Sequence, residues 1–146
     1  VLNVPCAAQA DIVQTVGSTS GLELTRDQGR DKFEVYGLPT FDAELIDAPM
    51  LEGCVAWLEC RLLPEPDNHQ QYDLFLAEVI AAQADERVFS DGRWHFEGQD
   101  ALRTLHHVAG GHFLTIGEPL ETFQGVLRGV PTYLGASNPL LGDEIP

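Results

Sequence analysis

The basic residues are the first candidates for chemistry, because the chain has only 8 of them against 23 acidic residues. Lys32 is the only lysine, and it follows a hydroxyl-rich turn, Ser18-Thr19-Ser20-Gly21. An ammonium group, hydroxyls and backbone N–H groups can together bind a phosphate. Serine-rich turns are common, however. The residues by themselves therefore favour a simpler interpretation, in which Lys32 is a solvated lysine paired with a neighbouring acid.

The histidines are the second set of candidates. His106, His107 and His112 surround the pair Gly110-Gly111. A metal site needs three or four converging ligands, whereas adjacent residues such as His106 and His107 diverge on a strand. No CxxC or HxxxH spacing occurs, so we predict no metal site. The histidines should act singly as hydrogen-bonding groups, and the glycine pair could let the backbone approach a flat ligand.

Other catalytic patterns are missing from the sequence. It has no G-x-S-x-G elbow, no GxGxxG string and no P-loop, so no catalytic residue is predicted. Cys54 and Cys60 lie on one predicted strand, where six residues span roughly 20 Å, too far for a disulfide. Free thiols are typical of a reducing compartment, and we predict a cytoplasmic protein.

Charge and hydropathy exclude several classes of partner. A formal net charge of −15 is repelled by nucleic acids and by anionic membrane surfaces. The longest stretches without a charged residue, 104–117 and 129–142, are shorter than the roughly 18 apolar residues of a membrane helix. The first residues have no initiator Met and no basic region before an apolar stretch, which is not the pattern of a signal peptide. They are typical of the middle of a strand, so we expect a domain whose opening residues are missing.

Hydrophobic periodicity predicts long strands and short helices. Strands are expected at 1–4, 53–63, 72–82 and 112–116, a polar loop at 64–71, and a helix at 7–16 that ends at Gly17. Asp31, followed three residues later by Glu34, predicts the cap of another short helix. This mixture is typical of a mainly β fold, a β-barrel with helical decoration.

The strand at 53–63 should have two different faces. Glu59 and Arg61 are expected on the polar face. The other face should be apolar and carry Ala56, Leu58, Cys60 and Leu62.

Several strings, taken in their order, resemble the flavin reductase-like FMN-binding split-barrel family, and in particular its flavoredoxin-like branch. The resemblance runs from residue 1 to about Gly117. Its strings are Val1-Leu2-Asn3-Val4-Pro5, the turn from Ser18 to Gly21, Asp31-Lys32-Phe33 with Gly37-Leu38, Ala56-Trp57-Leu58-Glu59-Cys60-Arg61, Tyr72-Asp73-Leu74-Phe75-Leu76-Ala77-Glu78-Val79, Ala84-Asp85-Glu86-Arg87, Asp91-Gly92-Arg93-Trp94, and Leu105-His106 with Gly110-Gly111.

The resemblance implies a fold and a function. The fold is a Greek-key split β-barrel at 1–120 without its first strands, followed by an arm or tail at 121–146, and two copies form a homodimer. The function is that of an FMN-binding oxidoreductase of the flavin reductase or flavoredoxin type. Such proteins transfer hydride or electrons between flavin and either a nicotinamide cofactor, NADH or NADPH, or a redox partner.

The resemblance also implies cofactor-binding residues. Lys32 matches the family's lysine in the Asp-Lys-Phe string, which points toward the FMN phosphate, and Ser18 and Ser20 are its helpers. His106 matches a histidine before the paired glycines, and Phe113 matches an aromatic position there. Both are expected to contact the flavin region.

Two departures from the family pattern leave alternatives open. Family members carry a stretch before the Val-Leu-Asn-Val strand that supplies much of the flavin pocket. Many also have a histidine near the start of the long strand that helps to receive the nicotinamide; here Tyr72 stands at that place, with His69 three residues earlier.

The main alternative is a non-catalytic split-barrel dimer module with weak or no flavin binding. A metal-binding protein using His106, His107 and His112 is the third possibility.

Overall fold

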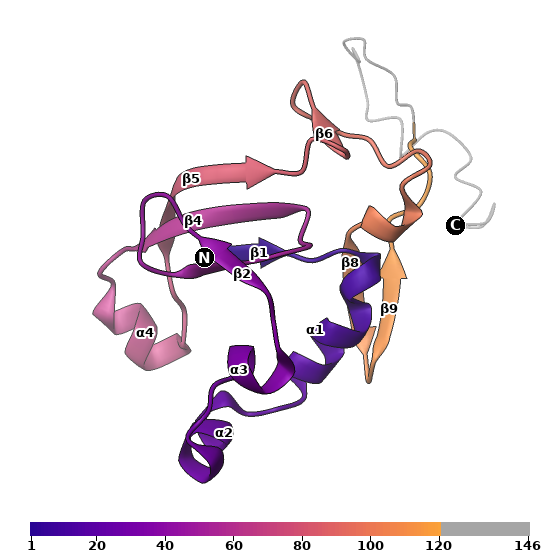
Figure 1. Cartoon of the computed structure of the whole chain (residues 1–146). Coiled ribbons are helices and arrows are strands. Elements are labelled where there is room, and N and C mark those ends of the chain that lie inside the picture. Colours follow the sequence, from indigo (N-terminus) through magenta and orange to yellow (C-terminus); the bar gives the residue numbers. More distant parts are fainter. Residues whose placement is uncertain (121–146) are drawn as a thin grey trace, which may run out of the picture.

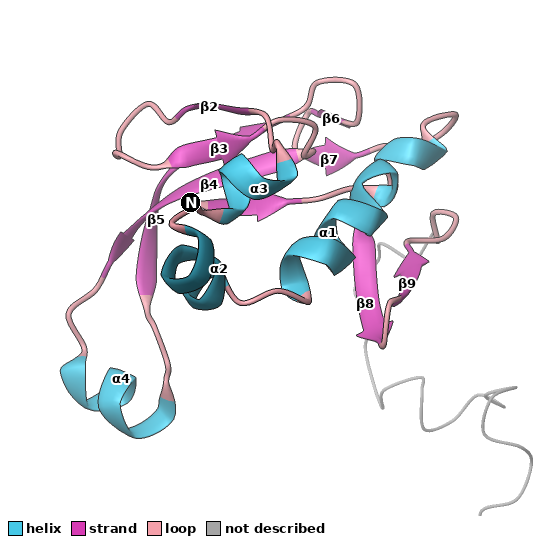
Figure 2. Ribbon diagram, turned by 60° about the horizontal axis from the view of Figure 1, so that its bottom comes forward, coloured by secondary structure: helices cyan, strands magenta, loops and turns pink. Residues whose placement is uncertain are grey.

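The computed structural model describes residues 1–120 (Figures 1 and 2). The predicted tail at 121–146 lies outside these residues. The central sheet has three strands in the order β1-β4-β5, all antiparallel. In this sheet β4 (Ala56–Leu62) lies between β1 (Leu2–Val4) and β5 (Ala77–Ala84), and the register places Asn3 opposite Trp57.

The remaining strands form two-stranded ribbons. These are β2 (Thr40–Asp42) with β3 (Pro49–Leu51), β6 (Phe89–Ser90) with β7 (Arg93–Trp94), and β8 (Leu105–Ala109) with β9 (His112–Thr115). The mainly β architecture with short helices is therefore confirmed. Within residues 1–120 the strands do not close into a barrel, and the split barrel stays a prediction.

Two of the helices follow the sequence pattern. The predicted helix at 7–16 is a 3-10 turn, η1 (Ala7–Gln9), that leads into α1 (Ala10–Gly17). Asp31 caps α3 (Lys32–Tyr36), because its Oδ1 accepts a hydrogen bond from the Glu34 N–H at 2.9 Å. Gly37, at φ 58°, ends this helix in the left-handed conformation that glycine tolerates best.

Two further helices were not predicted. The polar connection after Gly17 contains α2 (Gly21–Gln28), capped by Ser20. Ser20 with Glu23 three positions later is the sequence signal for this start, but only Leu24 of α2 is buried, so an apolar face is missing. The predicted loop at 64–71 contains α4 (Pro66–Tyr72), with Pro66 in the first turn.

The strand predicted at 72–82 is correspondingly displaced. Its first residues belong to the end of α4 and to the connection that follows, and β5 begins only at Ala77. Proline is favoured at the first position of a helix, since its missing N–H has no helical partner there. Pro66 is therefore a helix start here, where the sequence analysis took it as a sign of a loop.

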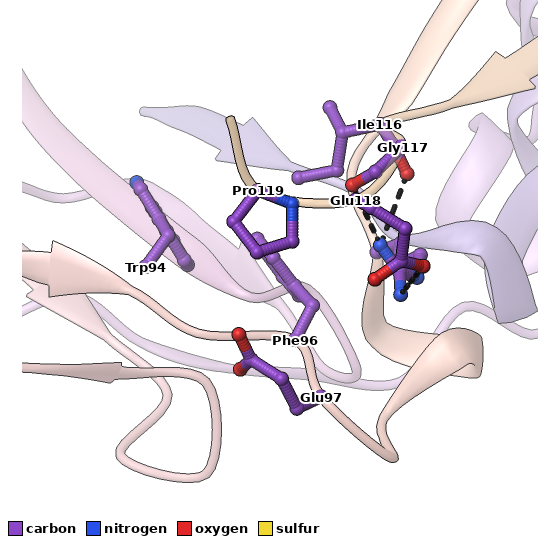
Figure 3. A pocket seen from close by; sticks show the side chains of 8 residues that line it. Trp94, Phe96, Glu97, Ile116, Gly117, Glu118 and Pro119 are labelled. Carbon is purple, nitrogen blue, oxygen red and sulfur yellow. Dashed lines mark hydrogen bonds and ion pairs between the residues drawn. The ribbon is translucent and has the colours of Figure 1, made fainter. Parts of the chain in front are cut away.

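A small core joins β1 to the segments around β4. It consists of Cys6, Val55, Val88 and Phe96, with Val4 and Leu102 packed against it. All three cysteines are free thiols, as predicted. A second tight cluster lies at the β6–β7 ribbon, where the Trp94 and Phe96 rings stack at 5.5 Å between centroids (Figure 3).

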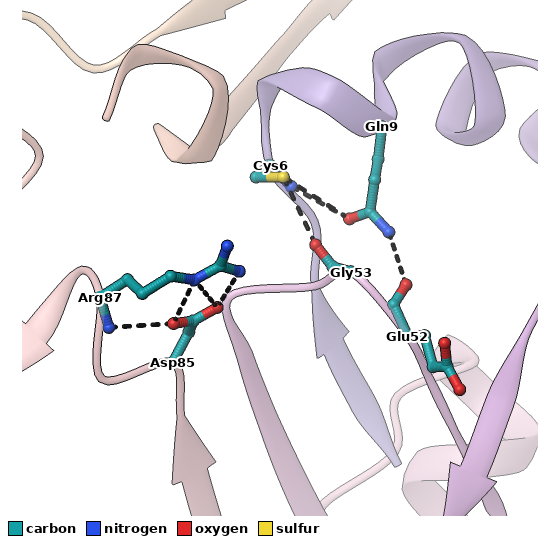
Figure 4. A network of polar contacts seen from close by, with 6 residues as sticks. All are labelled: Cys6, Gln9, Glu52, Gly53, Asp85 and Arg87. Atoms are coloured by element: carbon teal, nitrogen blue, oxygen red, sulfur yellow. Dashed lines mark hydrogen bonds and ion pairs between the residues drawn. The ribbon is translucent and has the colours of Figure 1, made fainter. Parts of the chain in front are cut away.

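Polar contacts fix the junction beside this core (Figure 4). The Gln9 amide donates to the Glu52 carbonyl at 2.9 Å, and the Cys6 thiol donates to the Gly53 carbonyl at 3.5 Å. Nearby, the Arg87 guanidinium binds the Asp85 carboxylate. This contact holds the pKa of Asp85 below its ordinary value. The junction thus links the start of η1 to the segment before β4.

The predicted faces of β4 need correction at two residues. Glu59 is only 1% exposed, and Leu62 is 53% exposed. The pairing of β4 with β5 shifts register between Glu59 and Cys60, where Ile80 of β5 is the extra, unpaired residue, as in a β-bulge. Arg61 is exposed as expected and forms an ion pair with Glu78.

The buried Glu59 carboxylate is bound by backbone. It accepts the N–H of Glu44 at 3.0 Å and the N–H of Leu45 at 2.7 Å. Burial by itself raises the pKa of Glu59, but the backbone N–H groups of Glu44, Leu45 and Ile46 favour the ionised form and leave the pKa below its ordinary value. This carboxylate holds the loop between β2 and β3 against β4.

Replacing Glu59 with Gln should lower the stability of the fold. The amide keeps the shape of the side chain but puts one donor where two backbone donors converge, so we expect the melting temperature to fall by on the order of 5 °C. The matched control is Glu78→Gln, which removes only an exposed ion pair and should shift the melting temperature by about 1 °C or less. Circular dichroism melts measure both, and equal melting temperatures for Glu59→Gln and the wild type would contradict this role.

The stabilisation from Glu59 should also depend on pH. Its pKa is lower in the folded chain than in the unfolded chain. The stabilisation is therefore fully present above the unfolded value of about 4.3 and is lost as the pH falls through the folded pKa. Urea midpoints measured between about pH 5 and pH 2 should fall more steeply for the wild type than for Glu59→Gln. Parallel pH profiles would show that the carboxylate is not the responsible group.

Candidate functional site

Lys32 lies where three helices meet. It is the first residue of α3, and its Nζ donates a hydrogen bond to the Val16 carbonyl, in the last turn of α1, at 2.6 Å. A Cβ added to Gly21, the first residue of α2, would lie 3.5 Å from Lys32 Cε. An ammonium group has three donors, so two remain available after the bond to Val16.

The ionic partners of the other basic residues set Lys32 apart. Among the described residues, every arginine except Arg93 forms an ion pair with a carboxylate, whereas Lys32 forms none. Within the described part of the chain, the acidic partner expected for Lys32 is therefore missing. Its partner there is a backbone carbonyl, and no carboxylate of these residues neutralises the charge of the ammonium group.

The two serines of the preceding turn differ in what they can offer a ligand. The Ser18 hydroxyl donates to the Gln14 carbonyl at 2.7 Å and accepts from the Gln14 amide at 2.9 Å, so its hydrogen is already engaged. The Ser20 oxygen accepts from the Glu23 N–H at 3.3 Å, which leaves its hydroxyl hydrogen free. The first N–H groups of α2 have no partner within the helix, and a helix N-terminus favours anions.

An apolar cavity of about 380 Å³ opens beside Lys32. Its walls come from β1, α1, α3, β3 and the segment before β4, and its apolar side chains are Pro5, Ile12, Val13, Val16, Phe33, Leu38 and Leu51. The Cys54 thiol also lines it, and burial raises the pKa of that thiol. Because the thiol is kept protonated, Cys54 is not an activated nucleophile.

A second cavity of about 300 Å³ lies between α1 and the β8–β9 ribbon. Ser18, His107, Gly110, Gly111 and Phe113 line it. The rings of His107 and Phe113, opposite each other in the ribbon, lie 5.0 Å apart between centroids. This cavity therefore combines an aromatic pair with a glycine turn.

The predicted site residues do not all meet. Ser18 and Phe113 line the second cavity, Lys32 lines the first, and Ser20 lines neither. The register places His106 opposite Leu114, on the other face of the ribbon from His107. The sequence offered His107 only as a possible metal ligand and not as a neighbour of Phe113. The alternation of a strand, counted back from Phe113 across the turn, is the signal that could have placed it beside that ring.

One other sequence candidate lies elsewhere. His69 belongs to α4, at the end of the β4–β5 pair that lies away from β8 and β9 (Figures 1 and 2). Its ring packs on Phe75 at 4.6 Å between centroids, and its Nε2 has no hydrogen-bond partner among residues 1–120. Within the same residues no group of three metal-ligating side chains converges, and no helix is long and apolar enough to cross a membrane.

A substitution at Gly111 tests the glycine turn of the second cavity. Gly111 has φ +82°, and an added Cβ would touch the Gln14 amide at 3.5 Å, an ordinary contact. The backbone conformation is therefore the main obstacle, and Gly111→Ala should lose about 1–2 kcal/mol of unfolding free energy. Gly117→Ala is the control, since nothing lies within 4 Å of its Cβ position; it should change the free energy by less than about 0.5 kcal/mol. Urea denaturation distinguishes the two, and an equal effect of both would refute the expectation.

Comparisons with known proteins agree on one family. The family model described as flavin reductase like domain matches residues 1–103. The uncharacterized protein YddH of Escherichia coli K12 is 43% identical over 116 residues, which are 79% of this chain and 58% of that protein.

Solved structures give the same result. The FMN-binding domain of a flavin reductases-like enzyme from Shewanella baltica is 44% identical with a TM-score of 0.74, over 83% of this chain and 61% of that one. Flavoredoxin of Desulfovibrio vulgaris has a TM-score of 0.61 at 20% identity, over 82% of this chain and 60% of that one, a likeness of fold alone. The chain thus spans about three fifths of the length of these relatives.

Proposed function

The chain belongs to the flavin reductase like domain family, and on that premise we propose that it binds FMN without a covalent bond and serves as an oxidoreductase. In this proposal hydride or electrons pass between the flavin and either NADH or NADPH or a redox partner. Further support comes from the Shewanella baltica relative, which is described as FMN-binding and is 44% identical to this chain.

One observation carries the proposal. Within residues 1–120 the ammonium group of Lys32 has no carboxylate partner, and it lies beside the start of α2 and at the wall of an apolar cavity. A phosphate monoester linked to a flat apolar ring system needs this combination of a cation, backbone donors and an apolar space. The residues present therefore fit FMN.

Each group has a distinct role in this site. Lys32 binds the phosphate through its two remaining N–H donors, and Ser20 donates its free hydroxyl hydrogen. Ser18 holds the end of α1 through its bonds to Gln14 and acts as a helper through the backbone. The apolar cavity excludes water from the ring, and when bound, FMN supplies a redox centre that accepts and returns hydride or electrons.

The second cavity adjoins the first, because Val13 and Gly17 line both. This neighbourhood supports a contact of Phe113 with the flavin region, and it makes His107 the better-placed imidazole. His106 reaches the flavin only if the ligand extends to the other face of the β8–β9 ribbon.

The wider arrangement is part of the same proposal. We expect residues 1–120 to belong to a Greek-key split barrel that two copies complete as a homodimer, with an arm at 121–146. The free thiols support a reducing, cytoplasmic location.

A non-catalytic module with weak or no flavin binding is the second candidate function. It is favoured by the position of His69, which belongs to α4, packs its ring on Phe75 after that helix, and does not line the Lys32 cavity. The visible spectrum of protein mixed with FMN and then desalted separates the two candidates. Retained flavin that NADH or NADPH bleaches without oxygen supports the oxidoreductase, and the loss of all flavin on desalting supports the module.

Removing the charge of Lys32 should weaken FMN binding specifically. Lys32→Met keeps an unbranched side chain that is one atom shorter but loses a charge-assisted contact to the phosphate, so the dissociation constant for FMN should rise at least about tenfold. Riboflavin, which has no phosphate, should bind the variant and the wild type equally. Titration of flavin fluorescence measures both constants.

Arg93→Met is the matched control for this experiment. Arg93 is the other basic residue of 1–120 without an ion pair, and it belongs to β7 of the β6–β7 ribbon. Its removal changes the net charge by the same amount but should leave the FMN constant unchanged. An equal loss in both variants would indicate a general effect of charge and would remove Lys32 from the phosphate site.

A further inference from the structure

The helix that carries Lys32 touches both the end of α1 and the α1–α2 connection. Lys32 Nζ binds the Val16 carbonyl at 2.6 Å, and one helical turn later the Tyr36 hydroxyl lies 2.7 Å from Thr19 Oγ1. Residues four apart lie on the same face of a helix. One face of α3 therefore spans the connection, with Lys32 at its start and Tyr36 at its end.

The direction of the second contact follows from the partners of Thr19. Thr19 Oγ1 donates its hydrogen to the Thr15 carbonyl at 3.2 Å, so toward Tyr36 it acts as the acceptor and the phenol hydroxyl is the donor. The Thr19 hydroxyl hydrogen is thus engaged inside the protein. Its role is to hold the turn and not to bind a ligand.

Side-chain hydrogen bonds hold the turn between Gly17, the last residue of α1, and Gly21, the first residue of α2. Ser18 is fixed to Gln14 on the α1 side. On the side of α2, the contact from Tyr36 to Thr19 links the turn directly to the helix that holds Lys32.

We propose that Tyr36 is a positioning residue that sets the distance between the Ser20 donor and the Lys32 ammonium group, and thereby makes the site selective for a phosphorylated flavin over riboflavin. The inference rests on the proposed function, because it assigns the phosphate to these two groups. It adds Tyr36 as a residue that determines selectivity although it contacts neither the phosphate nor the ring. Without the Tyr36 bond, the Ser20 hydroxyl and the Lys32 ammonium group are both still present, but the distance between them is no longer fixed.

The test compares FMN with riboflavin in Tyr36→Phe. Losing one hydrogen bond should weaken FMN binding about fivefold to tenfold, while the riboflavin constant stays unchanged. Thr19→Val removes the same bond and also the bond from Thr19 to the Thr15 carbonyl, so it should weaken FMN binding at least as much. Adding Tyr36→Phe to Thr19→Val should cause no further loss, because the bond between the two residues is already gone. Thr19→Ser keeps the hydroxyl and should bind FMN as the wild type does.

Titrations with FMN and riboflavin also test the control variant and show which results would contradict the proposal. Tyr72→Phe removes a phenol hydroxyl from the exposed end of α4 and should change neither constant. Equal weakening of FMN and riboflavin in Tyr36→Phe would reduce Tyr36 to a purely structural role, and unchanged FMN binding would overturn the inference outright. A wild type that binds no FMN would refute the proposed function itself, whereas weakening in Lys32→Met alone would leave that function standing without the role of Tyr36. If Tyr36→Phe does not fold, Thr19→Val carries the same comparison.

Discussion

The position of α1 depends on one buried polar junction, where the end of β1 meets the segment before β4. The Gln9 side chain is 6% exposed, and its amide bridges the Cys6 N–H and the Glu52 carbonyl. A buried amide without such partners costs about 1–3 kcal/mol. At Gly53, a Cβ would lie 3.1 Å from the Gln9 amide nitrogen, and φ is +81°, so glycine is required there. The junction therefore admits one arrangement, and both cavities take their shape from it, because α1 is a wall of each.

Electrostatics act on this site over a short range. A chain with a formal net charge of −15 repels anions at a distance, but salt screens exposed charges beyond about 8 Å at physiological ionic strength. An anion that reaches the surface responds to the nearest donors. Most described arginines are already bound to carboxylates, as Arg103 is to Asp100 and Glu118. Lys32 is bound to a neutral carbonyl, and its charge therefore acts locally even in a strongly acidic protein.

The sequence predicted what repeats along the chain and missed what depends on the folded arrangement. The Asp31 cap and the end of the first helix at Gly17 are local signals, and the structure has both. The helices α2 and α4 bury almost no apolar side chains, so no periodicity marks them. Glu59 was expected on a polar face, and its burial depends on the loop between β2 and β3, whose N–H groups bind its carboxylate only in the folded chain. The same holds for the candidate site, where Lys32 was identified by resemblance and His107 only by register.

The small size of α3 explains why its side chains matter for more than binding. A helix of five residues is not stable alone, so tertiary contacts must hold it. Two of these contacts are the bond from Lys32 to the end of α1 and the bond from Tyr36 to the α1–α2 connection. A ligand that pulled the ammonium group away from Val16 would weaken the helix that presents it. Because the ammonium group has three donors, an anion can bind through the remaining two without breaking that contact. The site can therefore take up a phosphate while α3 keeps both of its attachments.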